Sequence, residues 1–189
     1  MLVNGINVKD YSLHALHNKL GYVPQKAVLF SGTVRSNIAY GESDKPAATQ
    51  EDVKTAVAIA QGEEFIQGLE DQYDGYVAQG GANFSGGQKQ RLSIARAVCR
   101  KPEIYIFDDS FSALDYKTDR ELRKALKQQT SGVTSMIVAQ RIGTIRDADM
   151  IAVVDDGRIV GLGKHDELMK NCEVYQQIAY SQLSKEELA

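Results

Sequence analysis

The sequence predicts an α/β fold, with a mostly parallel sheet, helices on both faces of that sheet and an inserted helical lobe. In the second half of the chain, short and nearly all-apolar runs such as IYIF (Ile104–Phe107) alternate with segments of helical period. This alternation is typical of parallel strands that lie buried under helices. Residues 26–100 interrupt it with mostly helical patterns, so we expect them to form the inserted lobe.

In the first half, each expected element follows from a local pattern. The run LGYVPQ (Leu20–Gln25) is apolar until a proline stops it, as expected of a buried strand that enters a loop. Thr49 and Asp52 stand three residues apart at the start of a stripe of helical spacing, which indicates a capping box. In chain order we expect the end of a strand and a turn at 1–8, a strand at 20–25, helical segments from 33 to about 69, a glycine-rich loop at 71–83 and a helix at 88–98.

The second half supplies the rest of the predicted sheet. The dipeptide Asp156-Gly157 separates two apolar runs, which is a strong signal for a β-hairpin. In chain order we expect a strand at 102–109, a helix at 118–127, a strand at 134–140, a helical turn at 142–148, hairpin strands at 149–157 and 158–163, and helices at 164–170 and 174–183.

Composition excludes several classes of protein. The formal net charge is -3, so bulk positive charge does not indicate a nucleic-acid binder. The two cysteines, Cys99 and Cys172, have neither metal-ligand nor redox-motif spacing, which is typical of a reducing compartment. No apolar run approaches the roughly 20 residues needed to span a bilayer. Composition by itself therefore predicts a soluble and cytosolic chain, although the chain could dock on a membrane component.

The stretch NFSGGQKQR contains the most specific motif. Ser85, Gly86 and Gly87 precede a helix that is expected to begin near Gln88. Glycines let the backbone approach a ligand closely, and the start of a helix presents unpaired N–H groups and partial positive charge. The pattern therefore predicts an anion site for a terminal phosphate, with the Ser85 hydroxyl as an additional donor. Taken alone, it is equally well explained by a glycine turn that leads into a helix.

The run IYIFDD predicts a second chemical site. Its strand brings Asp108 to the carboxyl edge of the sheet, where α/β folds bind ligands. In phosphoryl-transfer proteins an acid at this place holds Mg²⁺, and a neighbour such as Asp109 orients the attacking water. Two solvated acids at the end of a strand are the alternative explanation.

Three further positions mean little singly. They are Gln25 just past a strand, Asp115 in SALD, and Gln140 in VAQR. In their order and spacing, however, these motifs resemble the ATP-binding-cassette family over essentially the whole chain. They match its glutamine loop, its FSGGQ signature, its Walker B strand ending at Asp108, its SALD loop and its switch loop. The segment VLFSGTVRSNIAYG and the closing DGRIVGLGKHDELM resemble the exporters of that family.

The resemblance implies a P-loop-NTPase-like fold and two cofactors, ATP and Mg²⁺. It assigns Gln25, Ser85, Gly86, Gly87, Gln88 and Asp115 to nucleotide binding, Asp108 and Gln25 to the metal, and Asp109 and Gln140 to catalysis. It implies that residues 1–189 are a partial nucleotide-binding domain. In it, 26–100 form the helical lobe with the signature, and 1–25 and 101–189 are the remainder of the core with the C-terminal helices.

The chain departs from the family pattern in three ways. It contains no G-x-x-x-x-G-K-[ST] phosphate loop, so it resembles a cassette that lacks this loop and the N-terminal β lobe. Asp109 stands where the family usually has glutamate, and Gln140 stands where it has the switch histidine. The aspartate side chain is shorter than that of glutamate by roughly 1.5 Å. A misplacement of a catalytic group by about 1 Å can lower the reaction rate on the order of 100-fold. In addition to these three departures, Gln79 stands where many exporters carry a glutamate.

These departures predict the degenerate half of a heterodimeric, multidrug-type exporter at the cytoplasmic face of the membrane. Its signature would complete the hydrolytic site of a second cassette, while its own site would be slow or inactive. The transmembrane domain would lie upstream in the same polypeptide. The isolated chain is expected to be inactive and poorly soluble, because the missing segments would leave apolar strand faces exposed.

Three alternatives remain open from the sequence. The chain could be a catalytically competent half of a homodimeric exporter, if Asp109 suffices for hydrolysis. It could be a cassette ATPase that acts on DNA or ribosomes, although the exporter-like segment and the acidic balance argue against this. It could also be a non-enzymatic remnant, because a chain without a phosphate loop should bind ATP weakly.

Overall fold

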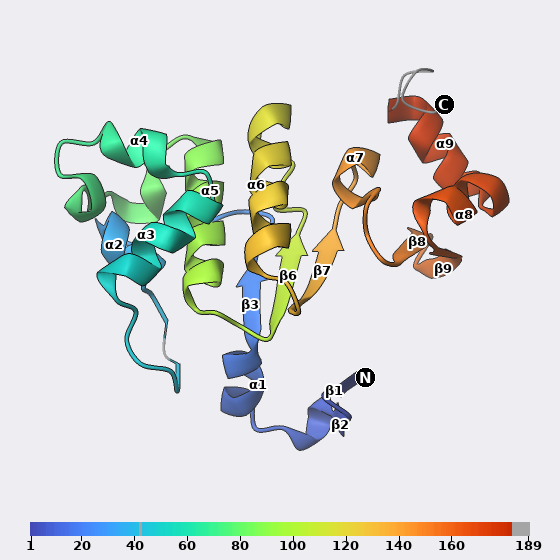
Figure 1. Cartoon of the computed structure of the whole chain (residues 1–189), viewed down its shortest axis with the longest axis horizontal. Helices are drawn as coiled ribbons and strands as arrows, with labels where there is room; N and C mark the ends of the chain where they lie inside the picture. The colour runs from blue at the N-terminus through green and yellow to red at the C-terminus, as the bar shows by residue number, and fades with distance from the viewer. Residues whose placement is uncertain (42, 183–189) are drawn as a thin grey trace. The chain divides into compact units, whose positions relative to one another are not determined.

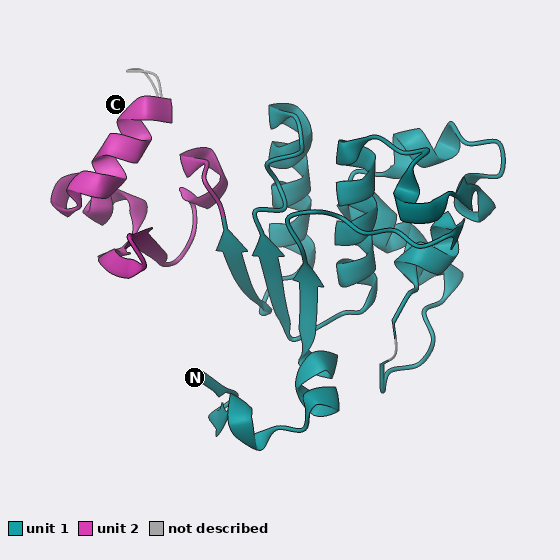
Figure 2. Ribbon diagram, turned by 180° about the vertical axis from the view of Figure 1, so that it is seen from behind, with its two compact units in different colours: residues 1–138 teal, residues 139–189 magenta. Residues whose placement is uncertain are grey.

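The computed structural model describes residues 1–41 and 43–182, which divide into two compact units. The first unit comprises residues 1–138 and the second begins at Ala139 (Figure 2). Each unit is described by itself below. Within the described residues, no helix is both long and apolar enough to cross a membrane.

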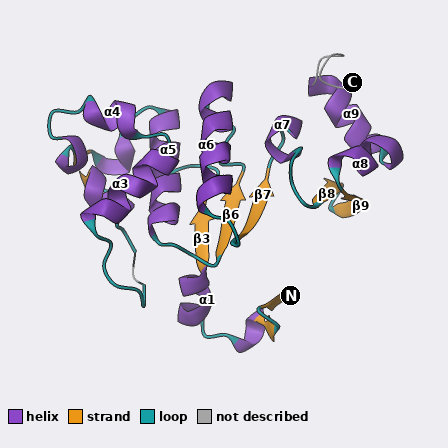
Figure 3. Cartoon of the chain, in the orientation of Figure 1, coloured by secondary structure: helices purple, strands orange, loops and turns teal. Residues whose placement is uncertain are grey.

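The first unit is built on a parallel sheet of three strands. In spatial order these are β3 (Leu20–Val23), β6 (Ile104–Asp108) and β7 (Thr134–Val138) (Figures 1 and 3). In the hydrogen-bonded register Val23 stands beside Phe107, and Phe107 stands beside Ile137. The three strands therefore end at the same edge. The α/β class and the parallel sheet predicted from the sequence are confirmed.

Exposure alternates along these strands and shows which face of the sheet is covered. Val23, Tyr105 and Phe107 point to one side and are at most 5% exposed, at 0%, 3% and 1%. Residues of the opposite side, such as Tyr22 and Met136, are 54% and 47% exposed. Figure 1 shows α6 in front of the strands, and Figure 2 shows the strands uncovered from behind. Within the first unit, the described helices therefore bury one face of the sheet, although apolar residues line both faces. The described residues of this unit do not supply the expected cover on the opposite face.

Six helices of the described first unit follow from capping and breaking residues. Thr49 and Asp52 form the expected capping box at the start of α3, and Asp52 also accepts a hydrogen bond from Lys101. Gly41 and Pro46 lie outside any helix, between the end of α2 and the start of α3. The helices are α1 (Leu13–Lys19), α2 (Val34–Ile38), α3 (Gln50–Ile59), α4 (Glu63–Gln67), α5 (Gly86–Cys99) and α6 (Tyr116–Gln129).

Two small antiparallel ribbons complete the first unit. Asn4 and Gly5 both have positive φ, at 50° and 79°, and turn the chain between β1 and β2. The opening residues thus form a hairpin, where the sequence predicted the end of a strand and a turn. The strands are β1 (Leu2–Val3) with β2 (Ile6–Asn7), and β4 (Gly32–Thr33) with β5 (Tyr76–Val77); short 3-10 turns lie at Val8–Asp10, Gln72–Asp74 and Gln79–Gly81.

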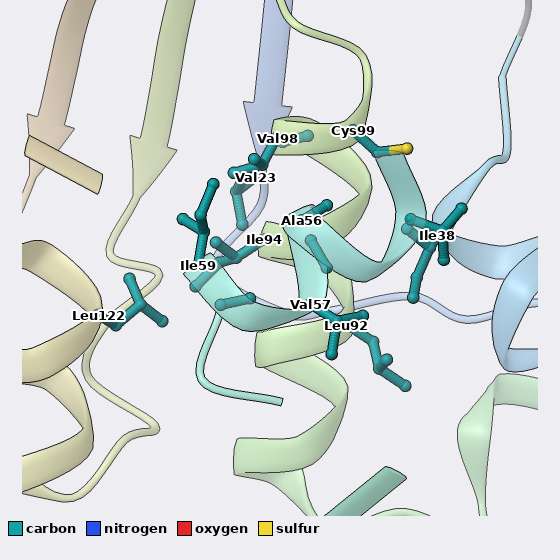
Figure 4. Close-up of a cluster of buried hydrophobic side chains, with 14 of the residues drawn as sticks. Val23, Ile38, Ala56, Val57, Ile59, Leu92, Ile94, Val98, Cys99 and Leu122 are labelled. Atoms are coloured by element: carbon teal, nitrogen blue, oxygen red, sulfur yellow. The ribbon is translucent and has the colours of Figure 1, made fainter. Parts of the chain in front are cut away.

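The core of the first unit joins the helices of region 26–100 to the sheet. Ala56 and Ile59 of α3 lie against Ile94 and Val98 of α5, and Val23 of β3 reaches the same cluster (Figure 4). All five are at most 7% exposed. This shared core fixes α5 beside β3, which matters for the site described below. The division at residues 26 and 100 stays a prediction.

The second unit holds a hairpin and three helices among its described residues. Asp156 and Gly157 have φ of 46° and 72°, which confirms the turn predicted from this dipeptide. Leu168 and Tyr175 belong to the unit's own apolar cluster. The elements are α7 (Ile142–Ile145), β8 (Ile151–Asp155), β9 (Arg158–Gly163), α8 (His165–Asn171) and α9 (Glu173–Gln182). Leu183, the expected end of the last helix, lies outside the described residues.

The buried phenol of Tyr105 predicts a stability change at high pH. Burial raises the pKa of Tyr105 to about 12, whereas an unfolded tyrosine ionises near pH 10.0. Its contribution to folding is therefore complete below about pH 10 and is lost as the pH rises toward 12. Relative to Tyr105→Phe, the protein should lose about 2 to 3 kcal/mol of stability over that range.

The measurement is the tyrosinate absorbance of the two proteins. Their difference should develop near pH 12, and a difference that developed near pH 10 would contradict the prediction.

Candidate functional site

Asp108 is the last residue of β6 and is held by a residue of β3. The Tyr22 hydroxyl donates to its Oδ2 at 3.0 Å. This hydrogen bond to a carboxylate is the main reason that the pKa of Tyr22 is raised. Tyr22 pairs with Ile106 in the register, so Tyr22 and Asp108 share a face of the sheet. Sequence reasoning missed Tyr22, because only the register reveals that it lies beside Asp108.

Asp109 follows the strand in an unusual backbone conformation. Its φ is 45°, and its N–H donates to the Val138 carbonyl of β7 at 2.9 Å. Its side chain is nearly buried, at 9% exposure, and its Oδ2 accepts the Gln25 amide at 3.0 Å. Aspartate tolerates this left-handed region better than most residues. The structure thus brings together two of the predicted site residues, Gln25 and Asp109.

Two buried side chains hold the backbone just before Gln25. The Ser110 hydroxyl donates to the Val23 carbonyl at 2.8 Å, and the Gln90 amide donates to the Pro24 carbonyl at 3.0 Å. Ser110 and Gln90 are 0% and 2% exposed. Gln90 belongs to α5, so the signature helix is tied to the glutamine loop. Sequence reasoning missed Gln90, although a polar residue on the otherwise apolar, buried face of this helix could have indicated it.

The signature residues form the first turn of α5. Ser85 is the N-cap: its Oγ accepts the Gln88 N–H at 3.2 Å, and the Gln88 Oε1 accepts the Ser85 N–H at 2.9 Å. The helix begins at Gly86, two residues earlier than expected, because this capping box includes both glycines. The first N–H groups of a helix have no partner within it. Those of Gly86 and Gly87 therefore face a ligand or solvent.

Neither signature glycine is required by the packing of the described residues. A Cβ built at Gly86 would meet nothing within 4 Å. A Cβ at Gly87 would lie 3.4 Å from the Ala113 carbonyl oxygen, which is an ordinary contact. The second distance also shows that the start of α5 lies beside the SALD loop, residues 112–115. The space at Gly86 is thus open to something outside this part of the chain.

Asp115 has a structural task in the described unit. It is the N-cap of α6, and its Oδ1 accepts the Thr118 N–H at 2.9 Å. These hydrogen bonds lower the pKa of Asp115. Ser112 donates to the Asp109 carbonyl at 2.9 Å, so the loop is also tied to the end of β6. The predicted contact of Asp115 with a nucleotide stays a prediction.

Gln140 belongs to the second unit and is described apart from Asp109. It follows the last strand of the sheet, and its carbonyl accepts the amide of Gln182 at 2.7 Å. Its predicted catalytic role stays a prediction.

The donor set at the strand ends fits Mg²⁺ bound together with phosphates. Among the described residues there is no group of three or more His, Cys, Asp or Glu that could hold a metal by itself. Mg²⁺ usually takes only one or two protein carboxylates and completes its shell with phosphate and water oxygens. Asp108 at the end of β6 could supply one such carboxylate, and the metal roles predicted for Asp108 and Gln25 stay predictions.

Comparisons with known proteins agree with this geometry. The family model described as ABC transporter matches residues 1–112. An ABC transporter ATP-binding protein of Mycobacterium tuberculosis is 46% identical over 96% of this chain and 31% of its own length. ABC transporter B family member 1 of Arabidopsis thaliana is 42% identical over 90% of this chain and 13% of its own.

A solved structure gives the same result. The structure of a bacterial Atm1-family ABC exporter with ATP bound has a TM-score of 0.91 and 35% identity to this chain. The match covers 97% of this chain and 32% of that one. The chain thus spans about a third or less of the length of these relatives.

The fold and the site motifs define an ATP-binding-cassette nucleotide-binding domain. The chain belongs to the ABC transporter family.

Removal of the Gln90 amide should loosen the glutamine loop. In Gln90→Met the partly buried Pro24 carbonyl loses its donor, which costs about 1 kcal/mol. Hydrogen exchange at the amides of Gln25 and Lys26 should therefore become faster in the purified protein. The control is Gln67→Met, the same change at an exposed position of α4. Equal exchange in both variants would show that Gln90 does not hold this loop.

Proposed function

We propose that this chain is the ATP-binding part of an ABC exporter subunit, at the cytoplasmic face of a membrane. In this proposal it works with a transmembrane domain and with a second, different cassette. Its signature completes the partner's hydrolytic site, while its own site holds ATP and Mg²⁺ with slow or no hydrolysis. The observation that carries the proposal is the intact SGGQ signature in the same chain as Asp109 and Gln140.

The open first turn of α5 supports the role of the signature. Ser85 and Gly86 are exposed, and no packing in the described residues requires glycine at position 86. A phosphate from outside the chain could meet the first N–H groups of the helix and its partial positive charge. The Ser85 Oγ accepts from Gln88 and can still donate its own proton outward. These features suit the nucleotide of a partner cassette.

The state of Asp109 supports slow chemistry in the chain's own site. A carboxylate that orients an attacking water needs an oxygen directed at that water. Here Oδ2 already accepts the Gln25 amide, and the arm is roughly 1.5 Å shorter than that of glutamate. In the switch loop, Gln140 can donate a hydrogen bond to a phosphate but cannot carry a proton. The chain's own groups therefore favour holding a nucleotide over hydrolysing it.

Asp108 and Gln25 are the residues that would hold Mg²⁺ in this proposal. The ion would neutralise phosphate charge when it is bound with the nucleotide. The Tyr22 hydroxyl orients Asp108. The hydrogen bonds to the Val23 and Pro24 carbonyls hold the backbone that leads into the glutamine loop. These contacts preorganise the site before any ligand arrives.

A bulky residue at the signature should stop turnover while a change at Asp109 should not. We expect Ser85→Arg in the complete exporter to abolish ATP hydrolysis, because the side chain would fill the partner's phosphate site. Asp109→Ala should reduce turnover by less than about tenfold, because the faster site does not use it. The measurement is ATPase activity of the reconstituted complex. Complete loss of turnover in Asp109→Ala would refute the slow-site proposal and favour a competent homodimer.

Restoration of the family residues should create a second hydrolytic site. The double variant Asp109→Glu with Gln140→His supplies the longer carboxylate and a group that can carry a proton. It should hydrolyse ATP even when the partner cassette carries an inactivating change, whereas the unmodified chain should not. Equal ATPase activity of the double variant and the unmodified chain, each paired with the inactivated partner, would contradict the roles assigned to positions 109 and 140.

A further inference from the structure

One side chain of the last described helix contacts the backbone on both sides of Arg141. The Gln182 Nε2 donates to the Gln140 carbonyl at 2.7 Å. The Gln182 Oε1 accepts the Ile142 N–H at 2.9 Å. A single amide thus bonds to the backbone on both sides of Arg141, at the end of the switch loop VAQR (residues 138–141), with both its donor and its acceptor. Gln140, Ile142 and Gln182 all lie in the second unit.

The Ile142 N–H needs a partner from outside its own helix. Ile142 is the first residue of α7, so no carbonyl within that helix can accept its N–H. The usual solution is a serine, threonine, aspartate or asparagine at the N-cap. Arg141 occupies that position and makes no side-chain cap. Gln182 supplies the missing acceptor from 40 residues away.

The position of Gln182 is set by the packing of α9. Tyr175 and Ala179 are 1% and 0% exposed, and Gln182 lies on the same helical face, one turn further on. The Tyr175 hydroxyl is hydrogen-bonded to the His165 Nδ1 at 2.8 Å, which ties α9 to α8. The amide therefore reaches the switch loop from a helix that is anchored in the core of the unit.

We propose that Gln182 is a positioning residue that fixes the backbone of the switch loop and so directs the side chain of Gln140. The backbone tie follows from the two hydrogen bonds. Its consequence for a nucleotide rests on the proposed function, in which Gln140 contacts the terminal phosphate. Sequence patterns did not indicate this role, because the tail YSQLSKEELA contains no recognised motif.

Three substitutions separate the two hydrogen bonds. Gln182→Met keeps the length of the side chain but can make neither bond. Gln182→Glu keeps an acceptor for the Ile142 N–H and loses the donor to the Gln140 carbonyl. The matched control is Gln177→Met, the same change at an exposed position of the same helix, where the amide contacts only the Glu173 carboxylate at 3.4 Å in the described residues.

The first readout is hydrogen exchange of the Ile142 amide in the complete exporter. In Gln182→Met it should become roughly fivefold faster, as expected for the loss of one hydrogen bond. In Gln182→Glu and in Gln177→Met it should stay within about twofold of the parent protein. Unchanged exchange in Gln182→Met would overturn the proposal.

The second readout is the release of radiolabelled ATP from the complete exporter, with Gln140→Ala for comparison. Gln182→Met should accelerate release by about as much as Gln140→Ala, and the double variant should be no faster than either. Accelerated release in Gln140→Ala alone would overturn the positioning role of Gln182. Unchanged release in both single variants, with faster Ile142 exchange, would support the backbone tie and refute the proposed role of Gln140.

Discussion

The register of the three parallel strands is the constraint on which the candidate site depends. Because β3 and β6 end at one edge, the residues that follow these two strands lie close together. Gln25 comes after β3 and Asp109 comes after β6, and their side chains meet at 3.0 Å. A slip of one residue would turn Asp108 to the other face and separate it from Tyr22. The sheet therefore determines the geometry before any loop contact is made.

Side-chain amides then fix the loops that the strands deliver. The Gln90 amide donates a hydrogen bond to the Pro24 carbonyl, and the Gln182 amide donates one to the Gln140 carbonyl. In both cases the amide holds the backbone at or next to a predicted site residue by bonding to a carbonyl. Backbone carbonyls away from regular structure need such donors. This explains how loops without secondary structure are held in one conformation.

The groups of the candidate site differ in how far the chain itself engages them. Asp109 is 9% exposed and already accepts the Gln25 amide. Ser85 and Gly86, in contrast, are exposed at an open helix start. Our proposal that this chain completes the site of a partner cassette rests on this difference between the engaged carboxylate and the exposed signature. The backbone at Asp109 is in the left-handed region, which aspartate adopts more readily than most residues do. This conformation is a second physical reason for aspartate at this position.

Local patterns were sufficient to predict the capping box of Thr49 and Asp52, the Asp156-Gly157 turn and the apolar strand that ends at Asp108. The capping box and the turn are stabilised by contacts between residues only a few positions apart, so the sequence determines them directly. The strand was predicted from its apolar run, although its hydrogen bonds go to the distant strands β3 and β7. The partners of Tyr22 and Gln90 were decided by tertiary structure alone, because these bonds join residues 86 and 66 positions apart. Tertiary structure also decided which face of the sheet the helices of the first unit bury. The strands are apolar on both faces, so their sequence does not distinguish the two.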